Sequence, residues 1–214
     1  MNQSAMRILI ADDHEVVREG LKQIIRKVNP FAEIEEASTG TDTLALLEKN
    51  SYDLAVMDIS MPGKSGLDVL QSLKDRNRKV PVLILSIHAE EQYAVRALKS
   101  GASGYLSKSS VYRELSTAID TILAGGRYIS PSLAAYLLSE TSDGTSRLPH
   151  EKLSAREFQV MCMLARGKSV NEIAEDLFIS NKTVSTHRTR ILTKMGMTKN
   201  AELTNYSLKN NLIE

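Results

Sequence analysis

The 214-residue sequence predicts an α/β domain with a five-stranded parallel sheet, followed by a small all-α domain of four helices. Up to about residue 125, short apolar runs alternate with longer amphipathic segments, and this alternation is typical of βαβ units. After residue 153 no strand-like run occurs, and apolar residues recur at helical spacing. At the usual ~150 residues per domain, the length by itself fits either one large domain or two small ones.

The first domain is expected to be a doubly wound, flavodoxin-like sheet. Its strand runs are continuously apolar rather than alternating, which favours strands covered by helices on both faces. Between them, Val16, Leu21 and Ile25 mark one amphipathic helix, and Leu115, Ile119 and others mark a later one. The predicted strands are Ile8–Ala11, Ile34 with its neighbours, Leu54–Met57, Val80–Leu85 and Gly104–Leu106.

Loop-forming residues divide the chain into a first domain at 1–125, a linker at 126–152 and a second domain at 153–214. Gly125 and Gly126 end the last helix of the first domain, and Pro149 lies near the end of the linker. Within the linker we expect one short helix over Pro131–Leu138. Ser130 is its expected N-cap, and Pro131 takes the first helical position.

The second domain is predicted to be of helix-turn-helix type. Ser154 to Glu157 form a capping box at the start of its first helix, and Gly167 ends that helix. The later helices are expected around Val170–Leu177, Asn181–Met195 and Asn200–Asn210, with Gly196 ending the third.

The net charge of +1 conceals two opposite halves. Residues 1–140 carry 16 basic and 18 acidic residues, whereas residues 141–214 carry 11 basic and 8 acidic ones. Between Asp176 and Glu202 every charged side chain is basic, which is the electrostatic pattern of a nucleic-acid-binding helix. These side chains are Lys182, Arg188, Arg190, Lys194 and Lys199.

Composition excludes several other classes. The 42% hydrophobic and 25% charged content is that of a globular protein, not a disordered one. One cysteine, Cys162, permits no intrachain disulfide and no cysteine-rich zinc site. The longest apolar stretch is far short of the ~20 residues that span a bilayer, and no signal peptide is recognised. We therefore expect a cytoplasmic protein that makes no contact with a membrane.

Acidic, hydroxyl and basic side chains are predicted to meet at one edge of the sheet. Asp12 and Asp13 follow the first strand, and Asp58 ends the third. Ser86 ends the fourth strand, and Lys108 follows the fifth. The carboxyl ends of parallel strands converge on one crevice. Three crowded carboxylates repel one another unless a cation lies among them, and oxygen ligands suit Mg²⁺. A lysine and a hydroxyl beside such a metal would bind the oxygens of a phosphoryl group. Asp58 is then positioned as a nucleophile that forms an acyl phosphate.

These residues resemble the receiver domain of two-component response regulators. The resemblance covers residues 7 to about 125 and rests on four motifs: Ile10–His14, Asp58–Gly63, Ser86 and Gly101–Lys108. It implies Asp58 as phosphoacceptor, and Mg²⁺ held by Asp12, Asp13, Asp58 and the Ser60 backbone carbonyl. It further implies Ser86 and Lys108 on the phosphoryl oxygens, with Ser86 and Tyr105 as the switch.

Three of the neighbouring side chains have alternative interpretations. An aromatic residue in an edge strand usually serves packing, so Tyr105 is open to that reading. His14 and His88 are expected to be solvated. Since His88 lies two residues after Ser86, it is also a candidate for influencing the attack of water on the phosphoryl group.

The third helix of the second domain has an apolar side and a hydroxylated, basic side. At 100° per residue, Val184, Ile191, Leu192 and Met195 share the core face. The outward face suits a helix lying in the major groove, whose N-terminal half meets the bases. We expect Ser185, Thr186 and Thr189 to contact bases. We expect Lys182, Thr183, Arg190 and Lys194 to contact phosphates.

Two further side chains of this helix lie near its core face. Arg188 must snorkel or find an acidic partner, and His187 is expected to be packed.

Residues 153 to about 210 resemble the LuxR-type helix-turn-helix domain. The motifs are Leu153–Glu157, Gly167–Ala174 and Ile179–His187. A receiver followed by this domain is the arrangement of NarL/FixJ-type response regulators. In that family the last helix often forms a dimer contact, for which Leu203, Tyr206 and Leu208 are candidates here. Ordinary core packing explains these three side chains equally well.

The function that this resemblance implies is transcription regulation controlled by Mg²⁺-dependent phosphorylation of Asp58. The expected partners are a sensor histidine kinase, double-stranded DNA and a second copy of the chain when phosphorylated, with RNA polymerase as a further candidate. The chain is expected to accept a phosphoryl group rather than to be an enzyme. One alternative is a constitutive DNA-binding regulator with a vestigial receiver. The other is an aspartyl-phosphate phosphatase, which usually needs an acid where this chain has Ser60.

Overall fold

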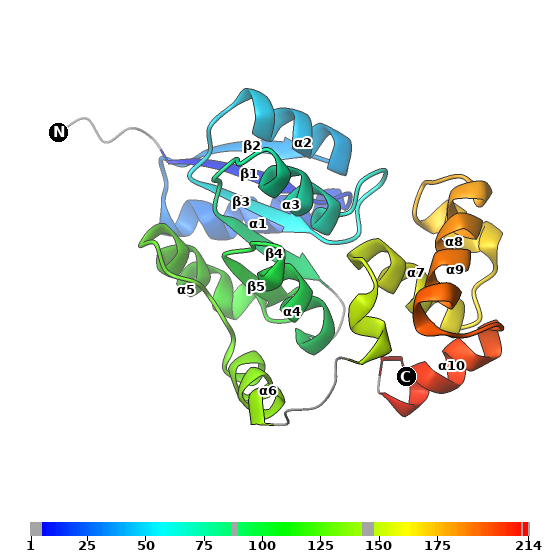
Figure 1. The fold of residues 1–214 in the computed structure, drawn as a ribbon. Coiled ribbons are helices and arrows are strands. Elements are labelled where there is room, and N and C mark those ends of the chain that lie inside the picture. Colours follow the sequence, from blue (N-terminus) through cyan, green and yellow to red (C-terminus); the bar gives the residue numbers. More distant parts are fainter. Residues whose placement is uncertain (1–5, 87–89, 143–147, 211, 214) are drawn as a thin grey trace. The chain divides into compact units, whose positions relative to one another are not determined.

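The computed structural model describes residues 6–86, 90–142, 148–210, 212 and 213. The chain divides into two compact units, Met1–Ser142 and Asp143–Glu214. Figure 1 shows strands and helices in the first unit and helices alone in the second. Over the described residues, no helix combines the length and the apolar character that crossing a membrane requires.

The first unit is built on one five-stranded sheet with the strand order β2-β1-β3-β4-β5. All neighbouring strands are parallel, so that Ile10 of β1 lies opposite Val56 of β3. This topology confirms the predicted doubly wound, flavodoxin-like sheet. The strands are β1 (Arg7–Ala11), β2 (Glu33–Ala37), β3 (Leu54–Asp58), β4 (Val82–Ser86) and β5 (Gly104–Ser107).

Two strands differ in detail from the sequence prediction. β4 begins at Val82 rather than at Val80, because Pro81 has no N–H to donate to the neighbouring strand. The Pro81 carbonyl still accepts a hydrogen bond from the Ala55 N–H at 2.9 Å. β2 reads Glu-Ile-Glu-Glu-Ala and forms one edge of the sheet. Charged side chains are common on such edges because they discourage pairing with other chains. For that reason only Ile34 stood out in the sequence.

Helices cover both faces of the sheet. In Figure 1, α1 and α5 lie on one face and α2, α3 and α4 on the other. The apolar stripes of α1 and α5 supply Leu21, Ile25, Leu115 and Ile119 to a core in which these side chains are almost completely buried. Burial of each such side chain contributes roughly 1.5–3 kcal/mol. These helices are α1 (Glu15–Val28), α2 (Gly40–Lys49), α3 (Gly66–Asp75), α4 (Glu90–Lys99) and α5 (Val111–Leu123).

A sixth helix, α6 (Pro131–Ser142), follows in the segment predicted as a linker, and it continues past the predicted end at Leu138. The hydroxyl oxygen of Ser130 accepts a hydrogen bond from the Leu133 N–H at 3.2 Å, which confirms the expected N-cap. α6 belongs to the first unit and packs against α4.

The second unit is the predicted small helical domain. Its first long helix, α7, packs against α8, α9 and α10, and its buried side chains include Phe158 and Met161. The capping box of Ser154 and Glu157 is present, and Gly196 ends α9 in the left-handed conformation with φ 67°. The elements are a 3₁₀ turn (Pro149–Lys152), α7 (Ala155–Ala165), α8 (Val170–Asp176), α9 (Asn181–Met195) and α10 (Asn200–Lys209).

Candidate functional site

The sheet topology brings the predicted acidic site together. β3 lies between β1 and β4, and β5 lies beside β4. Because all strands are parallel, their carboxyl ends reach the same edge. Asp12 follows β1, Asp58 is the last residue of β3, Ser86 is the last residue of β4, and Lys108 follows β5.

Asp58 and Lys108 form the centre of this site. The Lys108 Nζ atom lies 2.8 Å from Asp58 Oδ2 and 2.7 Å from Asp12 Oδ2. Asp12 has no exposed surface and Asp58 is 3% exposed, so both carboxylates depend on the lysine for compensation. The backbone also holds the lysine in place, since its N–H donates to the Ser86 carbonyl at 2.8 Å.

Burial shapes the ionisation of this pair. Desolvation raises the pKa of Asp58 to about 6, against the lowering effect of the Lys108 charge. Burial alone would lower the pKa of Lys108, but the Asp58 and Asp12 carboxylates raise it, and the net shift is upward. A positive charge is therefore fixed beside a carboxylate that is costly to ionise without further compensation.

Asp13 and His14 extend the acidic cluster toward solvent. The His14 Nδ1 atom lies 2.9 Å from Asp13 Oδ1 and 3.1 Å from Asp12 Oδ1. The His14 side chain is 65% exposed, yet its ring contacts both carboxylates, which the sequence interpretation did not foresee. One ligand atom from each of Asp12, Asp13, His14 and Asp58 lies within 4.8 Å of the others. This donor set is dominated by carboxylate oxygen, which suits Mg²⁺.

Glycine at position 66 is a positioning residue that sequence reasoning missed. A Cβ atom added to Gly66 would lie 2.3 Å from the carbonyl oxygen of Asp58, so no larger residue fits. The Gly66 N–H also donates to the Ile59 carbonyl at 2.9 Å. The first turn of α3 thus packs directly against the backbone of Asp58. The only signal in the sequence is a glycine beside Ser65, which caps α3.

The proposed switch residues lie on β4 and β5 and are both buried. Ser86 is 1% exposed, and Tyr105 is completely buried in β5. The two adjacent strands pair Ile84 with Tyr105 and Ser86 with Ser107. The structure therefore places both side chains inside the first unit. His88 lies outside the described residues.

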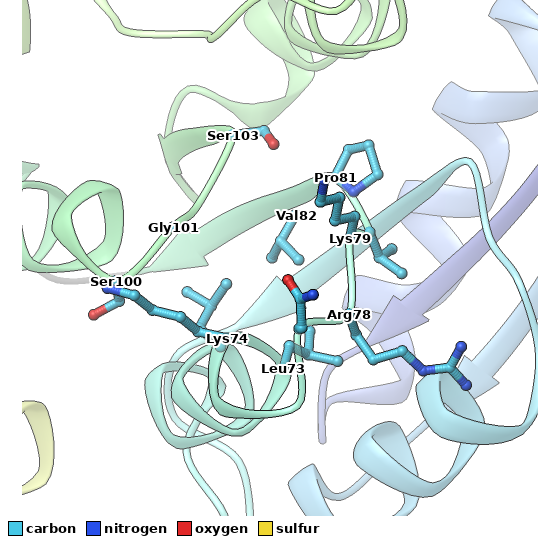
Figure 2. A pocket seen from close by; sticks show the side chains of 12 residues that line it. Leu73, Lys74, Arg78, Lys79, Pro81, Val82, Ser100, Gly101 and Ser103 are labelled. Atoms are coloured by element: carbon cyan, nitrogen blue, oxygen red, sulfur yellow. The ribbon is translucent and has the colours of Figure 1, made fainter.

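A cavity of about 420 Å³ opens at the opposite end of the sheet, near the start of β4 (Figure 2). Its lining includes Lys74, Lys79 and Ser103. Arg78 also borders it, but its guanidinium points away and donates to the Glu48 carbonyl of α2. This cavity is separated from Asp58 by the length of the central strands.

In the second unit, α9 presents the face that the sequence predicted. Val184, Ile191, Leu192 and Met195 are buried, which confirms the core side. Ser185, Thr186 and Thr189 are exposed on the outward side. The Thr186 hydroxyl donates to the Lys182 carbonyl at 2.9 Å, and the Thr189 hydroxyl donates to the Ser185 carbonyl at 3.1 Å. A threonine hydroxyl that donates to a backbone carbonyl can still accept a hydrogen bond, and the threonine methyl group remains available for apolar contact.

The basic side chains of α9 fall into two groups. Lys182 and Arg190 are exposed, and the hydroxyls of Thr183 and Ser180 lie 2.8 Å apart at the helix start. Lys194 instead pairs its Nζ with Glu157 Oε2 at 2.7 Å. Glu157 is 3% exposed and also serves the capping box of α7. Burial raises the pKa of Glu157, but Lys194 and the Ser154 N–H outweigh it, so the net pKa is lowered.

Arg188 and His187 are half-buried, as their positions beside the core face predicted. Snorkelling or an acidic partner was expected for Arg188, and its Nε donates to a neutral group, Asn200 Oδ1, at 2.8 Å. In α10, Leu203 is completely buried in the domain core, whereas Leu208 is 52% exposed. The Tyr206 hydroxyl lies 2.8 Å from His150 Nδ1.

Comparison with protein families identifies both units. The family described as the response regulator receiver domain matches residues 8–120. The family described as bacterial regulatory proteins, luxR family, matches residues 151–207.

Two relatives align along nearly the whole chain. "Response regulator UvrY" of Escherichia coli (strain K12) is 34% identical over 208 residues, covering 97% of this chain and 95% of UvrY. "Oxygen regulatory protein NreC" of Staphylococcus aureus (strain JH9) is 36% identical over 218 residues, covering 98% of this chain and 100% of NreC.

Solved structures show the same fold. A LuxR-family two-component response regulator from Aurantimonas sp. is 34% identical, with a TM-score of 0.60 over 65% of this chain and 100% of that chain. The response regulator RcsB in its complex with DNA gives a TM-score of 0.59 at 23% identity, over 95% of this chain and 98% of that one, and supports the fold alone. The chain belongs to the NarL/FixJ-type response regulators, transcription regulators of two-component systems that join a receiver to a LuxR-type DNA-binding domain.

Proposed function

We propose that this response regulator accepts a phosphoryl group on Asp58 and that this modification controls DNA binding by the second unit. The observation that carries the proposal is the Asp58–Lys108 pair at the end of the central strand, with a separation of 2.8 Å and a nearly buried carboxylate. A carboxylate fixed in this way is oriented before the reaction begins, so little entropy remains to be lost.

The chemistry is a phosphoryl transfer. A carboxylate oxygen of Asp58 attacks phosphorus, forming an O–P bond while the N–P bond of a kinase phosphohistidine breaks, and the histidine leaves with the electron pair. The Lys108 ammonium neutralises charge on the transferring oxygens, and the Ser86 hydroxyl donates to one of them. The product is an acyl phosphate that water hydrolyses.

The residues that would hold Mg²⁺ are Asp12, Asp13, Asp58 and the backbone carbonyl of Ser60. Ligand atoms of the three carboxylates lie within 4.8 Å of one another, which fits a hard cation with oxygen ligands. When bound, Mg²⁺ supplies positive charge that offsets both the crowded carboxylates and the incoming phosphoryl group. The pKa of about 6 for Asp58 describes the site before that compensation.

For the second unit we propose that α9 lies in the major groove of double-stranded DNA. The exposed side chains of Ser185, Thr186 and Thr189 face the bases. Lys182, Thr183, Arg190 and Lys194 face phosphates, and Lys194 must share its charge with Glu157. A single helix-turn-helix module reads only a few base pairs, so a phosphorylated homodimer on paired half-sites is expected.

The partners of this activity follow from the family and the chemistry. A sensor histidine kinase supplies the phosphoryl group, and DNA is the output target. RNA polymerase is a further partner to test, because a promoter-bound regulator acts on transcription. We place the protein in the cytoplasm, where DNA and the catalytic domain of a bacterial sensor kinase are both accessible.

DNA footprinting of the full chain, with and without beryllofluoride and Mg²⁺, tests the proposal. Protection is expected at lower protein concentration when the phosphoryl mimic is present, and this gain should disappear in Asp58→Asn. Equal protection under all conditions would show a constitutive DNA-binding protein with a vestigial receiver. Binding should also weaken steeply with salt, because phosphate contacts release counterions.

A further inference from the structure

The side of α9 that we expect to face the bases carries only small side chains. Ser185, Thr186 and Thr189 are exposed there and offer hydroxyl and methyl groups. In the major groove, guanine is usually recognised by arginine or lysine and adenine by asparagine or glutamine, each through a pair of hydrogen bonds. None of the three residues is of these types, so they need another way to distinguish one base pair from another.

The longer polar side chains of α9 lie to either side of these residues. Lys182 is exposed in the first turn, and Arg190 is exposed one turn beyond Thr186. Long cationic side chains at the two ends of a base-facing segment reach phosphates on the flanking backbone. The Asn181 amide at the helix start is engaged within the protein, because its Nδ2 donates to Asn171 Oδ1 of α8 at 2.8 Å. The direct reading of bases is therefore left to the small residues.

Both threonine hydroxyls already act as donors within the helix. The Thr186 hydroxyl donates to the Lys182 carbonyl at 2.9 Å, and the Thr189 hydroxyl donates to the Ser185 carbonyl at 3.1 Å. A hydroxyl has a single proton, so while these bonds last it can only accept a hydrogen bond from DNA. The same bonds hold each side chain in one rotamer, so each methyl group has a fixed position before DNA arrives.

The four bases differ in what they present to such a side chain in the major groove. Guanine presents two acceptors, N7 and O6, which an accepting hydroxyl cannot bond. Cytosine presents an amino donor but no methyl group. Adenine presents its N6 amino donor, and thymine presents its C5-methyl group. Among unmodified base pairs, only A·T thus combines an amino donor with a methyl group.

We infer that Thr186 and Thr189 select A·T base pairs. Each threonine methyl group packs against the C5-methyl group of a thymine, and each hydroxyl accepts a hydrogen bond from the N6 amino group of an adenine. Because the rotamers are already fixed, little side-chain entropy is lost on binding. This inference rests on the proposed placement of α9 in the major groove, and it adds which base pairs the helix reads and through which atoms.

Selection from a random library of DNA duplexes identifies the sequence on which to test this inference. The full chain, with beryllofluoride and Mg²⁺, is expected to enrich half-sites that contain A·T pairs. If the wild type enriches no sequence, the proposed DNA binding is wrong and the inference is wrong with it. If it enriches a sequence, the contribution of each threonine can be measured separately.

The decisive measurement removes a methyl group from either partner. Replacing one thymine of the selected half-site by deoxyuridine should weaken wild-type binding by about fourfold, the factor that corresponds to burial of one methyl group. Thr186→Ser keeps the hydroxyl but lacks the methyl group, so it should bind the thymine and deoxyuridine duplexes equally at that position. Thr189→Ser should do the same at a second thymine. Fluorescence anisotropy provides the four affinities of each cycle.

Thr193→Ser is the matched control. Thr193 is exposed on the same helix and its hydroxyl donates to the Thr189 carbonyl at 3.0 Å, but it lies in the C-terminal half, away from the expected base contacts. This variant should respond to deoxyuridine as the wild type does, and circular dichroism confirms that all three variants are folded. If deoxyuridine weakens the wild type, Thr186→Ser and Thr189→Ser by the same factor at every thymine, the inference is wrong, although the proposed DNA binding stands.

Methylated cytosine gives an independent test of the same contact. The A·T pair that couples to Thr186 is replaced by a G·C pair, with cytosine or 5-methylcytosine in the place of thymine. The wild type should bind the 5-methylcytosine duplex about fourfold more tightly, because the methyl group is restored at the same place. Thr186→Ser should bind the two duplexes equally. Equal binding by the wild type would contradict the inference.

Discussion

The two functional regions place their charge in opposite environments. In the receiver, Asp12 and Asp58 are almost completely buried and share one lysine. On α9, Lys182 and Arg190 extend into solvent. A buried charge is expensive and must be held by fixed partners, so such a site is preorganised for a small ligand. Exposed charges cost little and are screened by salt, which suits reversible binding to a polyanion. Lys194, paired with a buried glutamate, falls between these two cases.

The largest expected effect is loss of phosphoryl uptake. Asp58→Asn should abolish labelling by acetyl phosphate, because an amide lacks the nucleophilic carboxylate oxygen. Chelation of divalent metal with EDTA should have the same result in the wild type. Asp53→Asn is the matched control, since Asp53 is exposed at the opposite end of β3 and accepts a hydrogen bond from the Arg7 N–H. Labelling of Asp58→Asn at the wild-type level would show that another residue accepts the group.

The same substitution should stabilise the protein. Burial raises the pKa of Asp58 from 3.8 to about 6, so ionisation opposes folding. The penalty is complete above about pH 6, shrinks as the pH falls, and is absent below about pH 3.8. Each pKa unit corresponds to about 1.4 kcal/mol, so Asp58→Asn should gain up to about 3 kcal/mol at pH 7 without metal. Urea unfolding at pH 7 and pH 4 measures this difference. If the free energy of unfolding rose equally at pH 7 and pH 4, the charge of Asp58 would not be the cause of the gain in stability.

The basic residues of α9 should separate by whether they already have an acidic partner, as Lys194 does in Glu157. Lys182→Ala and Arg190→Ala should each weaken DNA binding by about 1 kcal/mol and reduce the slope of log K against log salt by about 0.9. Lys194→Ala should change binding less but lower the free energy of unfolding by about 1 kcal/mol, because Glu157 loses its partner. Fluorescence anisotropy across a salt series and urea unfolding provide these values. Lys209→Ala, at an exposed position of α10, controls for the loss of one positive charge. If all four variants had the same slope of log K against log salt, the expected difference between paired and unpaired cations would be wrong.

The smallest effect concerns the turn between α8 and α9. Phe178 has a positive φ of 51° and is 64% exposed, so its backbone is strained and its ring contributes little burial. Phe178→Asn should stabilise the chain by about 0.5 kcal/mol, since asparagine tolerates the left-handed region better. Thermal unfolding detects the shift. Destabilisation would show that the ring makes a contact worth more than the relieved strain.

Local patterns predicted most of the elements in both units. The apolar strand runs, the capping box at Ser154 and the glycine after α9 are each encoded within a few neighbouring residues. The acidic site was also predictable, because parallel strands bring their carboxyl ends to one edge whatever their detailed packing. β2 was only partly recognised, since an acidic edge strand carries almost no apolar signal.

Other features depend on contacts between distant residues. No local pattern indicates that Lys194 pairs with Glu157 or that Arg188 reaches Asn200. The fit of Gly66 against Asp58 and of Gly104 against Tyr128 depends on where two backbones meet. The docking of α6 likewise requires α4 and β5 to be in place first.

The sequence by itself determined the fold class, the order of the two units, the division of charge between them and the identity of the acidic residues. These properties follow from composition, periodicity and strand ends, which are local. Only the tertiary structure decided which carboxylates share Lys108, which cation of α9 is already paired, and that α6, the helix expected in the linker, packs against α4. These properties depend on distances of a few ångströms between groups far apart in the chain, because pairing and burial energies fall off steeply with separation.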